Sequence, residues 1–405
     1  MARRGGRRTV RAAVALLGIG CALGLSLGGC IGVPDAPRPE ASAVPAAEPG
    51  LAEKGGTVIG TGSVKVALIV PLSGQGAAVG SALRNAAELA YDDFQKPNLQ
   101  ILVKDDRGTP EGAREAAQAA FAEGAEMVLG PLFAGSVQAA GSAARAAGKP
   151  VVGFSTDAAV AARGVYLISF LPQSEVDRIV DEATAGGRRS FAALIPETTY
   201  GNAVEAQFRE AVARRGARLA GIERYAAGNP GPAVERLRGV IAGGGAQADA
   251  LFVPNTPEGL VAVASALTKV GFSPARVRPL GLALWNDPRV MAQPAFQGAR
   301  FAAPDAAGFA NFAQRYQARF GAPPPRTASL GYDAVSLTAA LVRQYGTQRF
   351  ADTTLTNPAG FSGLDGTFRF LPEGVSERTL AVYEIRNGAA SVVSPAPKVL
   401  GPSGI

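Results

Sequence analysis

The chain has 405 residues, which is enough for two domains of ordinary size, each with its own core. It contains no His and only two Cys, Cys21 and Cys30, so residues 31–405 offer neither imidazole nor thiol groups. This composition excludes His-based catalytic triads, thiol nucleophiles, zinc-type metal sites and disulfides from the body of the chain. Carboxylate and hydroxyl chemistry remain, and we expect neither a metal nor a cofactor.

The first thirty residues have the pattern of an export signal. Five arginines between positions 3 and 11 precede an apolar, Gly-rich stretch over Ala12–Gly29. Leu27-Gly28-Gly29-Cys30 then resembles the lipobox of bacterial lipoproteins. We therefore expect a signal peptide over 1–29 and lipid attachment at Cys30. An uncleaved membrane helix is the alternative, but the Gly content and the small residues before Cys30 favour cleavage.

Cleavage also changes the charge of the protein. The leader holds five arginines and no acid, so the formal net charge falls from +7 for the whole chain to +2 for residues 30–405. No run of Lys and Arg with interleaved aromatic residues follows, and we expect no nucleic-acid partner. Residues 30–64 comprise the lipidated Cys and a Pro-, Ala- and Gly-rich stretch without apolar periodicity, which predicts a disordered tether that holds a folded body near a membrane.

From Lys65 the apolar pattern alternates between strands and helices. The expected strands are 66–71, 99–104, 126–129, 150–154, 165–169, 190–195, 218–225, 249–253, 278–281 and 300–303. The expected helices are 77–95, 111–123, 134–147, 174–186, 201–215, 232–243, 257–271 and 307–319. Three helix-start signals place a capping side chain before Pro: Thr109-Pro110 and Thr256-Pro257 precede two of these helices, and Asp287-Pro288 marks a further start.

This alternation predicts an α/β fold with parallel sheets, right-handed crossovers and helices on both faces. Ten strands exceed the usual single sheet, so we expect two doubly wound parallel-sheet lobes. The first lobe would span 65–172 and be completed by about 300–345. The second would span 173–299 and be completed by about 346–395. A crossing between the lobes is expected at Phe170-Leu171-Pro172.

Three strands of the first half run directly into loops of Gly and small hydroxyl residues. These loops are Ser73–Gly76, Gly130–Ser136 and Ser155–Asp157. In an open parallel sheet such loops gather at the carboxyl ends of the strands, where ligands bind. Small residues let a ligand approach the backbone, and helix N-termini present unpaired N–H groups to an anion. The three loops therefore predict a ligand cleft.

Several short motifs follow one another between about Lys65 and Gly388: Val66–Gly74, Val103–Asp106, Leu129-Gly130-Pro131, Pro150–Thr156, Tyr200-Gly201, Gly331–Ala334 and Gly363–Phe370. In their order and spacing these motifs resemble those of the leucine/isoleucine/valine-binding group of type I periplasmic binding proteins. The resemblance implies two α/β lobes, joined by a hinge of three crossing segments, that close over a small ligand.

The resemblance also implies where the ligand is held. Family members hold an amino-acid carboxylate with backbone N–H groups and hydroxyls, and the matching loops here are Ala134–Ser136 and Ser155–Thr156. Tyr200 matches a Tyr that lines the cleft. With the first loop and the single Trp of the chain added, the candidate ligand-binding residues are Ser73, Ala134, Ser136, Ser155, Thr156, Tyr200 and Trp285.

Two positions depart from the family pattern. Amino-acid binders place a carboxylate in a loop of the second lobe to pair with the ligand ammonium, and the aligned position here is Ala283. Val79 replaces an aromatic residue of the first loop. A free α-amino acid is therefore expected only if another acid, such as Asp287 or Asp157, takes over this pairing. Trp285 could instead stack on a larger ligand.

Three functions remain open. The first is a non-enzymatic binder that delivers an amino acid or related anion to an ABC permease. The second is an interaction protein, because the chain also resembles lipoprotein penicillin-binding protein activators, which stimulate peptidoglycan synthases. Ile31, rather than Asp, after the lipidated Cys favours the outer membrane as the site of anchoring. The long tether and the missing ammonium-binding acid favour the second function.

The third function is an enzyme, such as a nucleotide-dependent oxidoreductase. Gly74, Gly76 and Gly80 follow a strand, but their spacing is G-x-G-x-x-x-G rather than the dinucleotide-binding G-x-G-x-x-G. Export would also separate the chain from cytoplasmic nicotinamide cofactors. We therefore expect an exported, periplasmic binding protein without enzymatic activity.

Overall fold

The computed structural model describes residues 57–401 except 96 and 227. The expected signal peptide, Cys30 and nearly all of the expected tether lie outside the described residues. The described residues fall in one compact unit. Among the helices that the structure describes, none combines the length and the apolar character needed to cross a bilayer.

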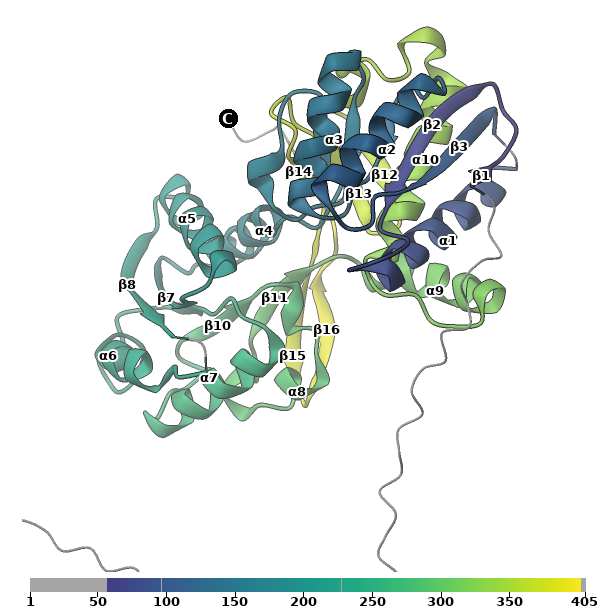
Figure 1. Cartoon of the computed structure of the whole chain (residues 1–405). Helices are drawn as coiled ribbons and strands as arrows, with labels where there is room; N and C mark the ends of the chain where they lie inside the picture. Colours follow the sequence, from purple (N-terminus) through teal and green to yellow (C-terminus); the bar gives the residue numbers. More distant parts are fainter. Residues whose placement is uncertain (1–56, 96, 227, 402–405) are drawn as a thin grey trace, which may run out of the picture. The chain divides into compact units, whose positions relative to one another are not determined.

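The first lobe is built on a six-stranded sheet in the order β1-β3-β2-β4-β5-β6 (Figure 1). Its strands are β1 (Val58–Ile59), β2 (Val64–Val70), β3 (Leu99–Asp105), β4 (Val128–Leu129), β5 (Val151–Gly153) and β6 (Val165–Leu167). The connecting helices are α1 (Ala77–Asp93), α2 (Pro110–Ala122) and α3 (Ala134–Ala147). Neighbouring strands are parallel, except that β1 runs antiparallel to β3.

The central strand β2 shows why the first sheet is covered on both faces. Val66 and Leu68 pack in one apolar cluster with residues of α1 and α10, whereas Ala67 and Ile69 pack in another with residues of α2 and α3. Side chains alternate between the two faces of a strand, so a strand buried on both faces must be apolar throughout. The uninterrupted apolar run 66–70 within β2 follows from this double burial.

The second lobe is built on a seven-stranded sheet in the order β16-β15-β11-β10-β9-β7-β8. Its strands are β7 (Ser190–Pro196), β8 (Arg218–Tyr225), β9 (Ala250–Phe252), β10 (Arg278–Gly281), β11 (Arg300–Ala303), β15 (Ala381–Arg386) and β16 (Ala389–Ser394). Its helices are α4 (Pro172–Ala185), α5 (Thr199–Arg214), α6 (Gly231–Ile241), α7 (Pro257–Lys269) and α8 (Pro288–Met291). Two further apolar clusters cover the two faces of this sheet.

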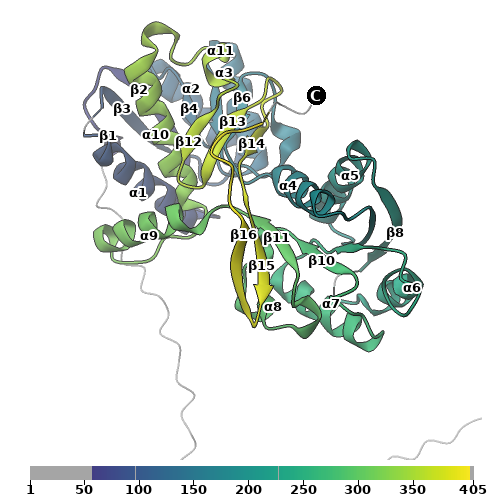
Figure 2. The same cartoon turned by 180° about the vertical axis from the view of Figure 1, so that it is seen from behind.

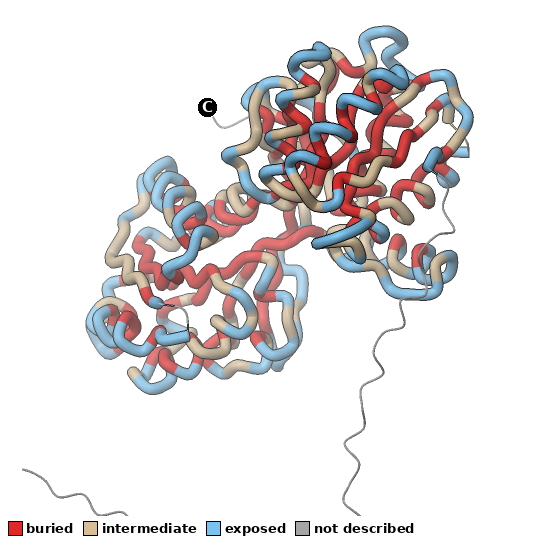
Figure 3. Tube along the Cα trace, in the orientation of Figure 1, coloured by how far each residue is buried: buried red, intermediate tan, exposed pale blue. Residues whose placement is uncertain are grey.

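The expected α/β fold of two lobes is confirmed, but neither sheet is wholly parallel. In the second sheet β15 pairs antiparallel with both β11 and β16. Buried segments follow the strands of both sheets (Figure 3). Each lobe therefore has a core on either side of its own sheet.

The C-terminal quarter returns first to one lobe and then to the other (Figure 2). Its elements before β15 are α9 (Ala306–Phe320), α10 (Ala328–Gln344), α11 (Asp352–Leu355), β12 (Phe361–Gly363), β13 (Gly366–Phe370) and β14 (Ser376–Arg378). Helix α10 packs on α1, and Phe368 and Phe370 of β13 join the cluster that covers β2. The three-stranded sheet β12-β13-β14 thus belongs to the first lobe.

The chain crosses between the lobes three times, at β6–α4, β11–α9 and β14–β15. The first crossing contains Phe170-Leu171-Pro172, as expected from the sequence. The other two differ from the expected boundaries. Residues 300–303 form β11, which pairs with β10 and β15 in the second sheet, and residues 346–378 lie in the first lobe. A local apolar pattern identifies a strand but carries no information about which sheet it joins.

Candidate functional site

A cleft of about 1070 Å³ is lined by residues of both lobes and of their crossing segments. The first lobe contributes Thr156, Asp157, Phe309 and Arg326, among others. The second contributes Glu175, Thr199, Tyr200, Gln207, Ala283, Leu284 and Asn286, among others. The crossing segments add Phe170, Leu171, Pro172, Ala303 and Pro304. The walls are thus largely apolar, with a few polar and charged side chains, as in most small-molecule sites.

Two long helices of the second lobe begin at the cleft. Pro172 and Gln173 of α4 and Thr199 and Tyr200 of α5 line it. Helix α4 has no side-chain cap, and α5 is capped by the uncharged Thr198, whose hydroxyl accepts a hydrogen bond from the Gly201 N–H at 3.0 Å. The first N–H groups of a helix carry partial positive charge. Both helix ends therefore favour an anion in the cleft.

Glu175 is an acid of the cleft wall whose pKa is strongly raised. It lies in the first turn of α4, only 9% of its surface is exposed, and its Oε2 accepts a hydrogen bond from the Ala283 N–H at 2.8 Å. Burial raises the pKa of Glu175 to about 7, and the bond from Ala283 opposes this shift only in part. Its Oε1 accepts no hydrogen bond from the described residues. Glu175 is therefore an acid with a free acceptor oxygen next to the Ala283 position.

Tyr200 lies beside Glu175 in the cleft wall. It is half-buried, and burial together with the nearby Glu175 carboxyl raises the pKa of its hydroxyl above the usual range. The phenol therefore stays neutral and can donate a hydrogen bond. This placement fits the sequence expectation that Tyr200 lines the cleft.

Arg326 is the one cation among the residues that line this cleft. It precedes α10, and its guanidinium lies 4.2 Å from the ring centre of Phe309 and 5.3 Å from that of Phe170. Its Nη2 forms an ion pair with Asp365, which is fully buried. Its Nη1 has no hydrogen-bond partner among the described residues. The guanidinium is thus fixed on one side and retains unused donors.

The expected carboxylate-binding loops are only partly at the cleft. Thr156 lines it, together with Asp157. Ser155 is buried just behind, and its hydroxyl accepts a hydrogen bond from the Asp157 N–H at 3.1 Å. Ala134 begins α3 without lining the cleft, and Ser136 is fully buried beside the Asp106 carboxyl.

Ser73 also stays outside the cleft lining. Its hydroxyl donates to Oδ2 of Asp105 at 2.6 Å, and Oδ1 of Asp105 accepts a hydrogen bond from the Leu72 N–H at 2.9 Å. Asp105 therefore braces the first loop from the end of the neighbouring strand. The Ser155 hydroxyl holds its own loop, which is the usual local role of such a residue, whereas the Ser73 hydroxyl ties its loop to the neighbouring strand.

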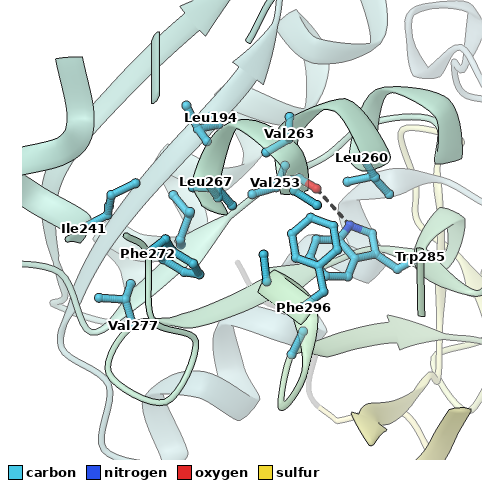
Figure 4. Packing of buried hydrophobic residues seen from close by; sticks show 14 of the residues in the cluster. Leu194, Ile241, Val253, Leu260, Val263, Leu267, Phe272, Val277, Trp285 and Phe296 are labelled. Atoms are coloured by element: carbon cyan, nitrogen blue, oxygen red, sulfur yellow. Dashed lines mark hydrogen bonds between the residues drawn. The ribbon is translucent and has the colours of Figure 1, made fainter. Parts of the chain in front are cut away.

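Trp285 is a core residue and does not face the cleft. It is fully buried, its Nε1 donates to the Val253 carbonyl oxygen at 2.9 Å, and its ring lies 4.4 Å from that of Phe296 (Figure 4). The expectation that Trp285 stacks on a ligand is therefore wrong. The indole N–H, its single polar group, is hydrogen-bonded inside the second lobe, and neither face of the indole is exposed.

Asp287 and Asp157 were the two acids expected to replace the carboxylate that pairs with a ligand ammonium. Asp287 caps α8 and pairs with Arg289, and it does not line the cleft. Asp157 lines the cleft, and its Oδ1 accepts a hydrogen bond from the Ala159 N–H at 3.0 Å, which caps the short 3₁₀ turn Ala158–Val160. The acid that reaches the Ala283 position is Glu175, 108 residues away in sequence.

Sequence reasoning missed Glu175, Phe309 and Arg326. One signal was available for Glu175, because it follows the predicted crossing at Phe170–Pro172 within one helical turn, and crossing segments border the cleft. No comparable local signal marks Phe309 or Arg326. In the part of the chain that the structure describes, no group of three acidic side chains is placed to hold a metal ion.

A family model described as "Periplasmic binding protein" matches residues 63–390. Among solved structures, a branched-chain amino acid ABC transporter protein from Rhodospirillum rubrum superposes with a TM-score of 0.72 at 23% identity, covering 82% of this chain and 99% of that one. No match was found among proteins with curated descriptions.

Two further solved structures are complexes. A substrate-binding protein from Streptococcus pneumoniae bound to isoleucine has a TM-score of 0.54 at 19% identity, covering 82% of this chain and 99% of that one. A solute-binding protein from Rhodopseudomonas palustris bound to benzoate has a TM-score of 0.54 at 19% identity, covering 83% and 98%. At these identities the likeness concerns the fold.

Proposed function

Because the chain belongs to the periplasmic binding protein family, we propose that it is a non-enzymatic, exported protein that binds a small amino-acid-like solute or related organic anion in its interlobe cleft. The observation that carries this proposal is the composition of the cleft. Both lobes line it, two helix N-termini open onto it, and Arg326, Glu175 and Tyr200 are its main recognition groups.

The proposed partner is the permease of an ABC-type uptake system. Support comes from the similar structures, several of which are ABC transporter binding proteins. We further propose that Cys30 carries a lipid anchor and that residues 30–64 tether the binding lobes to a membrane, with the outer membrane favoured by Ile31. The lipobox-like pattern Leu27-Gly28-Gly29-Cys30 supports the anchor.

The alternative proposal, activation of a peptidoglycan synthase, depended in part on the absence of an acid for a ligand ammonium. Glu175 removes that argument, because its carboxyl group is hydrogen-bonded to the Ala283 N–H in the cleft wall. The cleft therefore favours solute binding.

A thermal-shift screen of the purified protein, followed by calorimetry, tests the proposal. The screen covers the amino acids and a set of aliphatic and aromatic carboxylates. A ligand present at 100 times its Kd stabilises the folded state by about 2.7 kcal/mol, which raises the Tm by a readily measured amount. Co-purification with periplasmic peptidoglycan synthases is tested in parallel. Synthase capture without any solute binding would overturn the proposal in favour of the activator.

A further inference from the structure

The charged groups of the cleft point to a more specific ligand. We propose that Arg326 binds the carboxylate of an organic acid, and that Glu175 accepts a hydrogen bond from a hydroxyl or amino group at the other end of the same ligand. This inference rests on the proposed function, because it assigns the ligand class of that same cleft. It places the anion end of the ligand on the first lobe and the donor end on the second.

Arg326 is held in a position that suits binding of the ligand carboxylate. One side of the guanidinium is anchored by the buried Asp365, and its plane lies over the rings of Phe309 and Phe170. A guanidinium has five N–H donors in a rigid fork, and the pairing with Asp365 engages only Nη2. Nη1 lacks a partner among the described residues. The remaining donors match a carboxylate better than a neutral group.

The surrounding charges also favour an anion. The charged residues that line the cleft are Asp157, Glu175 and Arg326. Asp157 is engaged by the backbone of its own turn through the Ala159 N–H. Burial favours the uncharged form of Glu175. The N-termini of α4 and α5 add partial positive charge at the cleft wall, and this charge favours an anion.

Glu175 offers an acceptor oxygen to the hydroxyl or amino group at the other end of the ligand. Ala283 N–H fixes one oxygen of the carboxyl group at 2.8 Å, and the other oxygen has no partner among the described residues. The side chain is nine-tenths buried, but this oxygen is not one of the fully buried atoms without a partner, so a ligand in the cleft can reach it. A ligand hydroxyl or amino group would satisfy this oxygen. A ligand carboxylate at this position has no donor to offer to this oxygen.

The body of the ligand is expected to be apolar and flat. Phe170 and Phe309 on the first-lobe side and Tyr200 and Leu284 on the second-lobe side all line the cleft. Its volume of about 1070 Å³ is at the upper end of the range for small-molecule sites, so a ring fits between the two ends. The ligand class is therefore a hydroxy- or amino-substituted aromatic acid.

The test uses three probes that share one scaffold: 3-(4-hydroxyphenyl)propanoate, the same acid without its hydroxyl, and the corresponding hydroxylated carboxamide. Isothermal titration calorimetry measures each Kd for the wild type, Arg326→Gln and Glu175→Gln. We expect Arg326→Gln to weaken both acids about 10- to 100-fold and to leave the carboxamide unchanged. We expect Glu175→Gln to weaken the hydroxylated acid about 3- to 10-fold and the unsubstituted acid little.

Arg319→Gln is the matched control. Arg319 pairs with Glu88 and Asp92 and does not line the cleft, so this variant removes the same charge and also breaks ion pairs. Its Kd values should equal those of the wild type. If Arg326→Gln is too unstable to purify, Arg326→Lys keeps the charge beside Asp365 but loses the fork, and it should still weaken both acids.

The outcomes separate this inference from the proposed function. If the wild type binds amino acids or other solutes but none of these acids, or binds the acids as tightly after Arg326→Gln, the inference is overturned while solute binding stands. If the wild type binds no solute of any class in the wider screen, the proposed function itself fails. Equal loss of affinity for the acid and its carboxamide would show that Arg326 has only a structural role.

Discussion

Replacing Glu175 by Gln should stabilise the protein at neutral pH in the absence of ligand. The substitution preserves the shape of the side chain and an oxygen that can accept the Ala283 N–H, but it removes the ionisable group. In the folded protein the pKa of Glu175 is raised by burial from 4.5 to about 7. The folded state therefore holds a proton that the unfolded chain releases above about pH 4.5.

The sign and size of the effect follow from this difference. Between pH 4.5 and 7 the folded state binds more protons than the unfolded state, so this group lowers the free energy of unfolding as pH rises. A pKa shift of this size lowers the free energy of unfolding by about 3 kcal/mol. The full decrease is reached near pH 7 and stays constant above it. The Glu175→Gln variant has no ionisable group at this position, so its free energy of unfolding does not decrease in this way. The advantage of the variant over the wild type should thus grow from near zero at pH 4.5 to about 3 kcal/mol at pH 7.

Urea unfolding at pH 5, 6, 7 and 8 measures this difference. Trp285 is the only Trp of the chain and lies in the core of the second lobe, so its fluorescence reports on the lobe that contains Glu175. Other buried acids, such as Asp333 with a pKa of about 6, titrate in both proteins and cancel in the comparison. Glu235→Gln, at an exposed helix position, is the control and should show no such trend. An advantage of Glu175→Gln that does not change with pH would refute the reasoning.

Three further predictions concern stability. Trp285→Ala should cost about 3–5 kcal/mol in urea unfolding followed by circular dichroism, because it empties a fully buried site; a loss below 1 kcal/mol would contradict its place in the core. Gly80→Ala should lower the Tm sharply, since its Cβ would lie 1.8 Å from the Pro71 carbonyl oxygen, whereas Gly239→Ala meets nothing within 4 Å and should stabilise α6 by about 0.5–1 kcal/mol. Thr198→Ala should cost about 1 kcal/mol through loss of the α5 cap, and Thr198→Ser should recover most of it in the same assay.

Much of the fold was determined by local sequence signals. The capping side chains of Thr109, Thr256 and Asp287 accept hydrogen bonds from the first turns of their helices, as predicted. The apolar run was sufficient to predict a strand over 66–71, and the structure shows that β2 is buried on both faces. These signals act over a few residues, because caps and strand alternation are set by neighbours along the chain.

The tertiary structure decided which side chains reach the cleft. Ser136 and Trp285 carry the right chemistry for a ligand site, but packing directs both into the core. The position of Glu175 one turn after the predicted crossing suggested only that it borders the cleft, and folding placed its carboxyl group beside Ala283. The direction in which a side chain points depends on contacts between segments more than a hundred residues apart, and no local pattern in the sequence records those contacts. The sequence alone therefore determined the order of the elements, and only the packing of the lobes determined the site.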